Sequence, residues 1–462
     1  MTQRALPDGF VVRLHDDVEL ESHLFAGPRV LRLSDRARST ICDRTVTVGS
    51  PLTAAVANRL LDLDLVDPVI GPQVDRSDDV TVVVPVRDHA DGVDRLLEHL
   101  AGGMRCVVVD DASADPAALA AVAARHGARL VRLDHNVGPS MARNAGLARV
   151  TTPLVAFVDA DVTVCAPALA GLTRHFADPR LAAVAPRIMT ASGRRWFQRY
   201  DAAHSSLDLG AVAATVRPRS TITYLPTACL VARVDALGPG FDPTLRSGED
   251  VDLVWRLQDQ GFRVRYAAEA VAHHETRGSM TGWLGRKAFY GTSAAPLAAR
   301  HAERVAPALL SPATAVVAGG SIVGRRWSVL AAVCGVIFIV RHGRQGMSGL
   351  APRRLARSAA AAGLSEARQV SALMLRHWWP ISLLLAVVSP RFRRVLVATA
   401  VVDGVVARCS SDAVLDTPRF ILARRADDVA YGAGVWWGAA RGRSAACLAP
   451  QWLRPGRRTV SR

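Results

Sequence analysis

The chain has 462 residues, half of them hydrophobic, and a formal net charge of +16. This length allows two or three domains with sizeable cores, and the composition excludes a disordered or low-complexity protein. The basic balance leaves three kinds of partner open: nucleic acid, an anionic membrane surface and a phosphorylated substrate.

The seven cysteines are scattered, without the C-x-x-C or zinc-type spacing of a metal site. The segment from Met1 to Phe10 lacks the basic and apolar pattern of a secretory signal. We therefore expect a cytosolic, reducing location for the soluble part of the chain.

The first region, residues 1–74, combines short strand and helix patterns. Alternating apolar residues predict strands at 10–14 and 30–33. Helical spacing over 50–65 starts with Ser50 and Pro51, which suit an N-cap and a first-turn proline. Such a mixture of short elements predicts a small winged-helix-like module, followed by a polar linker.

The second region, residues 79–297, alternates apolar β-branched runs with helical stretches. This rhythm is typical of βαβ units, and it predicts an α/β domain with a mainly parallel sheet covered by helices on both faces. The predicted strands are residues 80–86, 106–110, 130–133, 154–159 and 181–185.

The third region, residues 306–407, is strongly apolar in runs bounded by arginines. Each run is shorter than the roughly 20 apolar residues that a spanning helix needs. Spanning helices, re-entrant hairpins and a buried helical domain all agree with this pattern. The basic flanks and Trp327, Trp378 and Trp379 are typical of a membrane interface, so we expect a membrane-associated region. A basic tail, residues 408–462, follows it, and we expect this tail to be loose after Gly438.

A carboxylate pair, Asp159 and Asp161, follows the fourth predicted strand of the α/β region. Parallel sheets bind ligands beyond the carboxyl ends of their strands. Mg²⁺-like cations bound by one or two carboxylates complete their shells with phosphates and water. Such an ion offsets charge on a diphosphate leaving group. An isolated D-x-D is usually a solvated turn, but its place in this series of strands favours a metal–diphosphate site.

Two upstream loops lie at neighbouring predicted strand ends. Asp110 and Asp111 follow the second strand, and residues 136–144 open a helix whose N-terminal amides and Arg143 offer an anion site. Each loop alone would be read as a turn with a helix cap.

Downstream, Glu249 and Asp250 stand in the first turn of a predicted helix, where the helix dipole favours acids. The functional hypothesis makes Asp250 a general base for an acceptor hydroxyl, with Glu249 orienting the acceptor. A later stretch contains His273, His274 and Arg277. The imidazoles are candidate metal ligands or phosphate donors, and the arginine is a candidate diphosphate contact.

These segments occur together in an order and spacing that resemble family 2 glycosyltransferases over about residues 79–296. The resemblance implies a GT-A fold, a nucleoside-diphosphate sugar donor, Mg²⁺ or Mn²⁺, and inversion at the anomeric carbon. It assigns the nucleoside and diphosphate side to Pro85, Asp111, Arg143 and Asp159, the metal to Asp161 with Asp159, and the base to Asp250.

The sequence departs from this family at two places. The Q-x-x-R-W signature of processive members is absent, which puts extrusion of a long polymer in doubt. Thr227-Ala228-Cys229 stands where Gly-Gly-Asn is often seen, which puts the acceptor geometry in doubt.

The whole layout resembles the mycofactocin-system branch of the family. That resemblance implies premycofactocin or its precursor peptide as a partner, captured by the first module through strand addition. It also implies UDP-glucose as the donor, a short β-linked oligosaccharide as the product, and a place at the cytoplasmic face of the cell membrane.

Three alternatives stay open. The first is a family 2 enzyme acting on a cell-wall or lipid-linked acceptor. The second is a membrane-anchored recognition protein with a degenerate domain, which the intact carboxylates disfavour. The third is a nucleic-acid reader, which is disfavoured because the acids of the first region do not suit a helix that enters a phosphate-rich groove.

Overall fold

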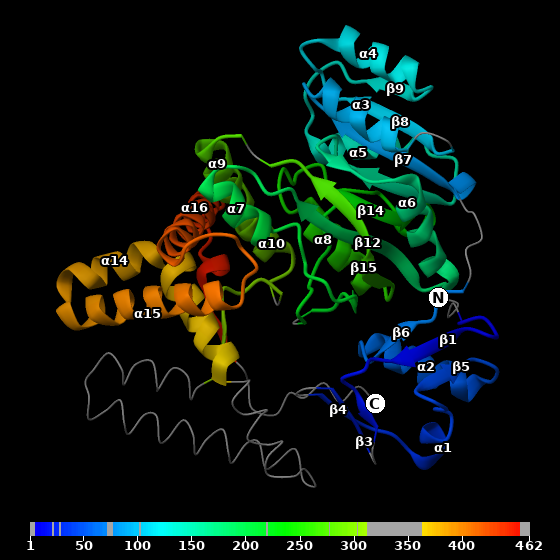
Figure 1. Cartoon of the computed structure of the whole chain (residues 1–462), viewed down its shortest axis with the longest axis horizontal. Coiled ribbons are helices and arrows are strands. Elements are labelled where there is room, and N and C mark those ends of the chain that lie inside the picture. Colours follow the sequence, from blue (N-terminus) through cyan, green and yellow to red (C-terminus); the bar gives the residue numbers. More distant parts are fainter. Residues whose placement is uncertain are drawn as a thin grey trace. The chain divides into compact units, whose positions relative to one another are not determined.

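The computed structural model describes residues 5–20, 23–26, 29–71, 77–100, 103–218, 220–276, 278–302, 304–311 and 363–452. It divides the chain into two compact units (Figure 1). The first unit comprises Met1–Gly193 with His204–Thr276, and the second comprises Arg194–Ala203 with Arg277–Arg462. This grouping differs from the four segments predicted from the sequence, because residues 194–203 join the later part of the chain.

The N-terminal part of the first unit is built on a three-stranded antiparallel sheet and one long helix. The sheet has the order β5–β1–β6, and a separate three-stranded sheet has the order β2–β3–β4. The elements are β1 (Val11–Leu14), β2 (Glu19–Leu20), β3 (His23–Ala26), β4 (Arg29–Arg32), α1 (Asp35–Arg38), β5 (Thr45–Thr47), α2 (Pro51–Asp62) and β6 (Val66–Pro68).

Helix α2 starts where the sequence predicts. The Ser50 hydroxyl accepts a hydrogen bond from the Thr53 amide, the Thr53 hydroxyl accepts one from the Ser50 amide, and Pro51 occupies the first turn. The apolar face of α2 packs with Val12 and Leu14 of β1 into one core. The strands predicted at 10–14 and 30–33 and the helix at 50–65 are therefore confirmed, and the winged-helix-like class stays a prediction.

The α/β part of the first unit is a nine-stranded mixed sheet. The path runs β11–β15–β12–β14–β10–β7–β8–β9, with β13 beside β15. The strands are β7 (Val80–Val86), β8 (Arg105–Asp110), β9 (Arg129–Arg132), β10 (Leu154–Val158), β11 (Val162–Thr163), β12 (Leu181–Thr190), β13 (Ala214–Thr215), β14 (Cys229–Arg233) and β15 (Arg263–His274).

The strands β10, β7, β8 and β9 are parallel, as the alternating pattern predicts. Strand β14 runs antiparallel to both β10 and β12, and it joins this parallel half to the parallel pair β12–β15. The connecting elements are η1 (Ser77–Asp79), α3 (Ala90–His99), α4 (Pro116–Arg125), α5 (Pro139–Leu147), α6 (Ala166–Thr173), η2 (Arg174–Ala177), η3 (Val234–Ala236) and α8 (Glu249–Asp259).

The second unit is mainly helical. Its elements are α7 (Trp196–Ala203), α9 (Met280–Gly291), α10 (Ala294–Arg300), β16 (Leu309–Leu310), the π-helix η4 (Leu373–His377), α14 (Trp379–Val388), α15 (Pro390–Cys409), α16 (Thr417–Arg441), η5 (Ala446–Leu448) and β17 (Gln451–Trp452). An aromatic cluster of Phe197, Tyr200, Trp283 and Phe420 ties α7 and α9 to α16.

Helix α16 lies in the segment predicted as a basic tail, residues 408–462, and its 25 residues are in close contact with α9. Glycines permit this approach. A Cβ atom at Gly434 would lie 1.8 Å from the Ala288 carbonyl oxygen, and one at Gly291 would lie 2.1 Å from the Tyr431 carbonyl oxygen.

The expected apolar run at 306–323 lies outside the described residues from position 312 on, and so does the whole run at 327–340 with Trp327. Across the described ranges no single helix is both long and apolar enough to cross a membrane. Two helical segments, Gly363–His377 and Trp379–Val388, are long and apolar enough to cross a membrane only when taken together. They are bent by 87° at their junction.

Candidate active site

The Asp159-Ala160-Asp161 turn lies at the end of a fully buried strand. All five residues of β10 are buried, and β10 lies between β7 and β14. Beyond it the Asp159 amide donates to the Ala228 carbonyl at 3.0 Å, and the Asp159 carbonyl accepts from the Val162 amide at 3.0 Å. The chain therefore bends sharply, and both carboxylates lie at the strand end where a parallel sheet binds ligands.

Arg143 of α5 is a buried cation beside this turn, with a side chain only 4% exposed. Its guanidinium donates to Asp159 at 2.6 Å and to Glu249 at 2.8 Å, and it stacks on the Phe241 ring. Burial opposes the charged form, but the two carboxylates outweigh this effect and raise the pKa of Arg143. Arg143 thus connects the carboxylate turn to the start of α8.

Carboxylates outnumber cations at the turn. Burial raises the pKa of Asp159, and the neighbouring Asp161 raises it further, while Arg143 acts in the opposite direction. A bound cation would relieve this repulsion.

Helix α5 holds the surrounding loops through three hydrogen bonds made by two of its side chains. The Ser140 hydroxyl donates to the Leu245 carbonyl at 2.8 Å. The Asn144 amide group donates to the Phe241 carbonyl at 2.8 Å and accepts from the Phe241 amide at 2.9 Å. Gly240 is required here, since its φ is +77° and a Cβ atom would lie 2.3 Å from the Asn144 oxygen. The segment that leads to α8 is therefore held on α5.

Asp111, assigned from the sequence to the nucleoside pocket, is buried and shapes the loop before α5. Its carboxylate accepts from the amides of Val137 at 2.7 Å and Gly138 at 2.9 Å. Pro85, the other nucleoside candidate, lies partly buried in β7. The β7 and β8 ends are linked because the Asp88 carboxylate accepts from the Ala114 amide at 2.7 Å.

Glu249 and Asp250 form the first turn of α8, preceded by Gly248 with φ +80°. Glu249 is buried against Arg143, whereas the Asp250 carboxylate accepts only from the Val251 amide among the described hydrogen bonds. Burial and the charge of Glu249 raise the pKa of Asp250 to about 7. This value suits a general base that works near neutral pH.

The two candidate histidines separate in the structure because residues alternate along β15. His274 Nε2 lies 3.4 Å from the Asp161 carboxylate, whereas His273 is exposed. The Nδ1 atom of His274 is buried without a hydrogen-bond partner among the described groups. Arg277, the candidate diphosphate contact, lies outside the described residues.

Glu275 and Gly92 support the carboxylate turn, and the sequence analysis gave neither of them a role. The Glu275 amide donates to the Asp161 carbonyl at 3.0 Å, and its carboxylate pairs with Arg95 of α3. A Cβ atom at Gly92 would lie 2.2 Å from the Ala160 carbonyl oxygen, so only glycine lets α3 approach the turn. The position of Glu275 directly after the histidine pair was the one signal available.

Among the described residues no group of three or more His, Cys, Asp and Glu side chains could hold a metal ion on its own. One or two carboxylates suffice for an ion that takes its other ligands from phosphates and water. Asp161 and Asp159 supply the one or two carboxylates of such a site, and His274 Nε2 lies next to Asp161.

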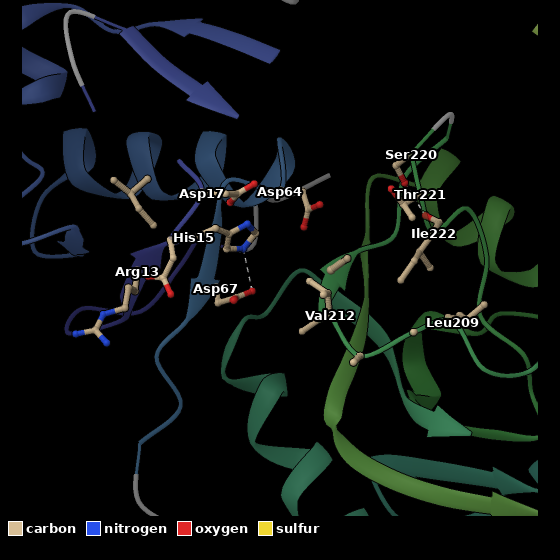
Figure 2. A pocket seen from close by; sticks show the side chains of 16 residues that line it. Arg13, His15, Asp17, Asp64, Asp67, Leu209, Val212, Ser220, Thr221 and Ile222 are labelled. Carbon is tan, nitrogen blue, oxygen red and sulfur yellow. Dashed lines mark hydrogen bonds and ion pairs between the residues drawn. The ribbon is translucent and has the colours of Figure 1, made fainter. Parts of the chain in front are cut away.

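A cavity of about 930 Å³ is lined by the N-terminal part and by loops of the α/β part (Figure 2). His15 and Asp67 lie 3.1 Å apart on its wall, with Asp64 and Asp17 nearby. Asp67 is partly buried, which opposes its charge, but His15 and Arg265 lower its pKa to about 2. Leu209, Val212 and Ile222 supply an apolar side.

Comparison with known proteins agrees with this architecture. The family model described as "Glycosyl transferase family 2" matches residues 81–238. The chain is 41% identical to the "Pre-mycofactocin glycosyltransferase" of Mycobacterium tuberculosis (strain CDC 1551 / Oshkosh), over 98% of this chain and 99% of that protein. It is 30% identical to the "Succinoglycan biosynthesis protein ExoU" of Rhizobium meliloti (strain 1021), over 40% of this chain and 59% of that protein.

Among solved structures, the mannosyltransferase PcManGT from Pyrobaculum calidifontis, in complex with GDP-Man and Mn²⁺, is 19% identical with a TM-score of 0.38. The match covers 70% of this chain and 84% of that one. The S. aureus TarS 1-349 structure in complex with UDP is 18% identical with a TM-score of 0.35, covering 46% of this chain and 65% of that one. At these values the structural likenesses carry no further argument.

Proposed function

The chain belongs to the pre-mycofactocin glycosyltransferases of glycosyl transferase family 2, and from this premise we propose that it moves glucose from UDP-glucose onto premycofactocin. The proposed reaction inverts the anomeric carbon and builds a short β-linked oligosaccharide. The donor sugar, the stereochemistry and the product rest on family analogy. The transferase chemistry itself also has support in the geometry of the site.

One observation carries the proposal: the donor carboxylates and the candidate base are linked through a single buried arginine. Arg143 contacts Asp159 at the end of β10 and Glu249 at the start of α8, and Asp250 follows directly. This link fixes the base relative to the donor side before substrates bind. Such preorganisation places an acceptor hydroxyl and an anomeric carbon for in-line attack.

Asp250 would take the proton from the acceptor hydroxyl as the acceptor oxygen bonds to the anomeric carbon. The bond from that carbon to the diphosphate oxygen breaks on the opposite side, and the diphosphate leaves with the electron pair. Glu249 would orient the acceptor, and its contact with Arg143 restrains the rotation of its carboxylate.

Asp161, with Asp159 and His274, would hold Mg²⁺ or Mn²⁺, which when bound would offset the charge that develops on the leaving diphosphate. Asp159 is held by Arg143, so Asp161 is the better candidate for direct contact with the ion. His273 is exposed and faces away from this group, so we do not assign it to the ion.

The N-terminal part would capture premycofactocin or its precursor peptide. Strands β5 and β6 are the two edges of its main sheet, and an extended peptide can pair with such an edge. The cavity in Figure 2 adjoins the β6 edge through Asp67, and it offers acids and an apolar wall. An acceptor with a basic group and an apolar body would suit this lining.

We place the enzyme at the cytoplasmic face of the cell membrane. The exposed aliphatic residues of the second unit support that place, and they also support a second candidate function, transfer to a lipid-linked acceptor of the cell wall.

The test is transfer by purified protein supplied with UDP-glucose and either Mg²⁺ or Mn²⁺. Premycofactocin and a polyprenyl phosphate are offered in separate reactions, and the products are read by mass spectrometry. The proposal expects hexose added to premycofactocin only. Hexose on polyprenyl phosphate alone would select the second candidate, and no transfer to either acceptor would contradict both.

A further inference from the structure

Helices α14 and α15 form an antiparallel pair (Figure 1). The placement of apolar and polar side chains on this pair is the reverse of that in a soluble hairpin. Their outward side chains are aliphatic: Leu384 is 69% exposed, Val387 78% and Val388 83% on α14. Val397, Val401 and Val402 are exposed on α15. We refer to these six side chains as the aliphatic face.

Two polar groups of the same helices are turned inward. Ser382 of α14 is buried, and Asp403 of α15 pairs with Arg424 and Arg425 of α16. Gly404 lies beside Asp403 and lets α15 approach Ile421 of α16. In water a helix pair would place these groups the other way round.

Three exposed cations follow directly after α14, at the start of α15. Arg391, Arg393 and Arg394 stand in the first turn of α15, and none of them forms an ion pair among the described residues. Guanidinium groups bind phosphates through paired hydrogen bonds. The aliphatic face and these arginines together match acyl chains bordered by anionic headgroups.

We propose that the aliphatic face inserts into the acyl chains of an anionic lipid bilayer, with Arg391, Arg393 and Arg394 bound to lipid phosphates. The aliphatic face would be the surface through which the protein contacts the membrane, so this proposal rests on the proposed membrane location. It is independent of the sugar-transfer reaction. Helix α14 has 10 residues and is about 15 Å long, half of a hydrocarbon core of about 30 Å. Helix α14 is therefore too short to cross a bilayer by itself.

The composition of the face favours lipid over a protein partner. The residues that dominate binding at protein interfaces are enriched in Trp, Tyr and Arg, whereas Leu and Val are under-represented among them. They also carry hydrogen bonds across the contact. The six side chains of the aliphatic face offer neither an aromatic ring nor a polar atom.

Vesicle co-flotation of the full-length protein, without donor or acceptor, tests the proposal. One set of vesicles contains phosphatidylcholine alone, and the other contains equal parts of phosphatidylcholine and phosphatidylglycerol. Val388→Glu should weaken binding to the mixed vesicles by at least about tenfold, because a buried aliphatic side chain is lost and a charge is introduced. Val414→Glu is the matched control, since Val414 is 77% exposed in the same unit but outside the hairpin, and it should bind as wild type.

Replacing Arg391, Arg393 and Arg394 with Gln should weaken binding to the mixed vesicles by about fivefold per arginine, with the loss growing at low salt. Binding to phosphatidylcholine alone should change little. Unchanged flotation of Val388→Glu would overturn the proposal. So would a dimer in wild-type protein that Val388→Glu converts to a monomer without any loss of flotation, because the face would then belong to a second copy. Neither outcome bears on sugar transfer, which is measured separately.

Discussion

The strand-end site of the first unit and the α14–α16 region of the second both bury arginine–carboxylate groups, but they treat apolar side chains in opposite ways. In the first unit the aliphatic residues of β10 are buried and the carboxylates gather at the strand end. In the second unit the aliphatic residues of α14 are exposed, and the Asp403 carboxylate of α15 pairs with Arg424 of α16. Arginine–carboxylate pairs therefore have different roles in the two units. In the first unit they prepare a reaction site, and in the second they leave the aliphatic face free of negative charge.

The largest expected effect concerns the reaction site of the first unit. Asp250→Asn removes the candidate base while keeping the size of the side chain, so we expect the turnover number to fall by about 10²–10⁴-fold. Steady-state transfer to premycofactocin measures it. Asp259→Asn, at the exposed end of the same helix, is the control and should retain wild-type turnover. Equal rates for the two variants would remove Asp250 from the mechanism.

The next prediction compares the two buried networks directly. Arg143→Met leaves Asp159 and Glu249 without their shared cation, so the free energy of unfolding of the first unit should fall by about 3–5 kcal/mol. Asp403→Asn should cost the second unit less, about 1 kcal/mol, because Arg425 keeps its ion pair with Asp428 and Arg424 is 28% exposed. Hydrogen exchange resolved by unit distinguishes the two losses. Equal losses would contradict the contrast.

Three glycine-to-alanine substitutions sharpen the comparison at smaller cost. Gly92→Ala should destabilise the first unit by about 1–3 kcal/mol, since the new Cβ atom meets the backbone oxygen of Ala160. Gly404→Ala meets the side chain of Ile421, which can rotate, so about 1 kcal/mol or less is expected. Gly285 of α9 has open space around it, so Gly285→Ala should be neutral or stabilising by about 0.5–1 kcal/mol. Urea titration ranks the three, and the reverse order would contradict these contacts.

The pH dependence tests the candidate base without a substitution. The pKa of Asp250 is raised to about 7, so its carboxylate is protonated below that pH and cannot accept the acceptor proton. We expect kcat/KM to fall about tenfold per pH unit below 7 and to level off above it. The residual activity of Asp250→Asn should lack this limb. A profile that stays flat from pH 5 to pH 7, roughly the range where a shifted carboxylate titrates, would contradict the assignment.

The strand ends were predictable from the sequence because periodicity and local order determine them. The parallel strands β7, β8 and β10 and the position of Asp159 and Asp161 follow from apolar runs and their flanking acids. The role of Arg143 did not follow, since its partner Glu249 is 106 residues away along the chain. Only the fold shows that a candidate phosphate contact is held between two carboxylates.

The sequence pattern also did not predict that β14 is antiparallel or that His273 and His274 have different surroundings. Strand β14 has only five residues and four of them are buried, so its sequence shows no alternation of buried and exposed positions. His273 and His274 became distinguishable once β15 was known to be a strand, because neighbours on a strand face opposite ways. The reversed polarity of α14 and α15 depends on which face α16 covers, and a list of apolar residues does not contain that information.

Calorimetric titration of UDP-glucose into the purified protein, with and without Mn²⁺, tests most directly whether the carboxylate turn holds a metal and a diphosphate. We predict Mn²⁺-dependent binding to the wild-type chain and its loss in Asp161→Ala, while Asp259→Asn binds as wild type. Mn²⁺-dependent binding of equal strength by Asp161→Ala would contradict the account.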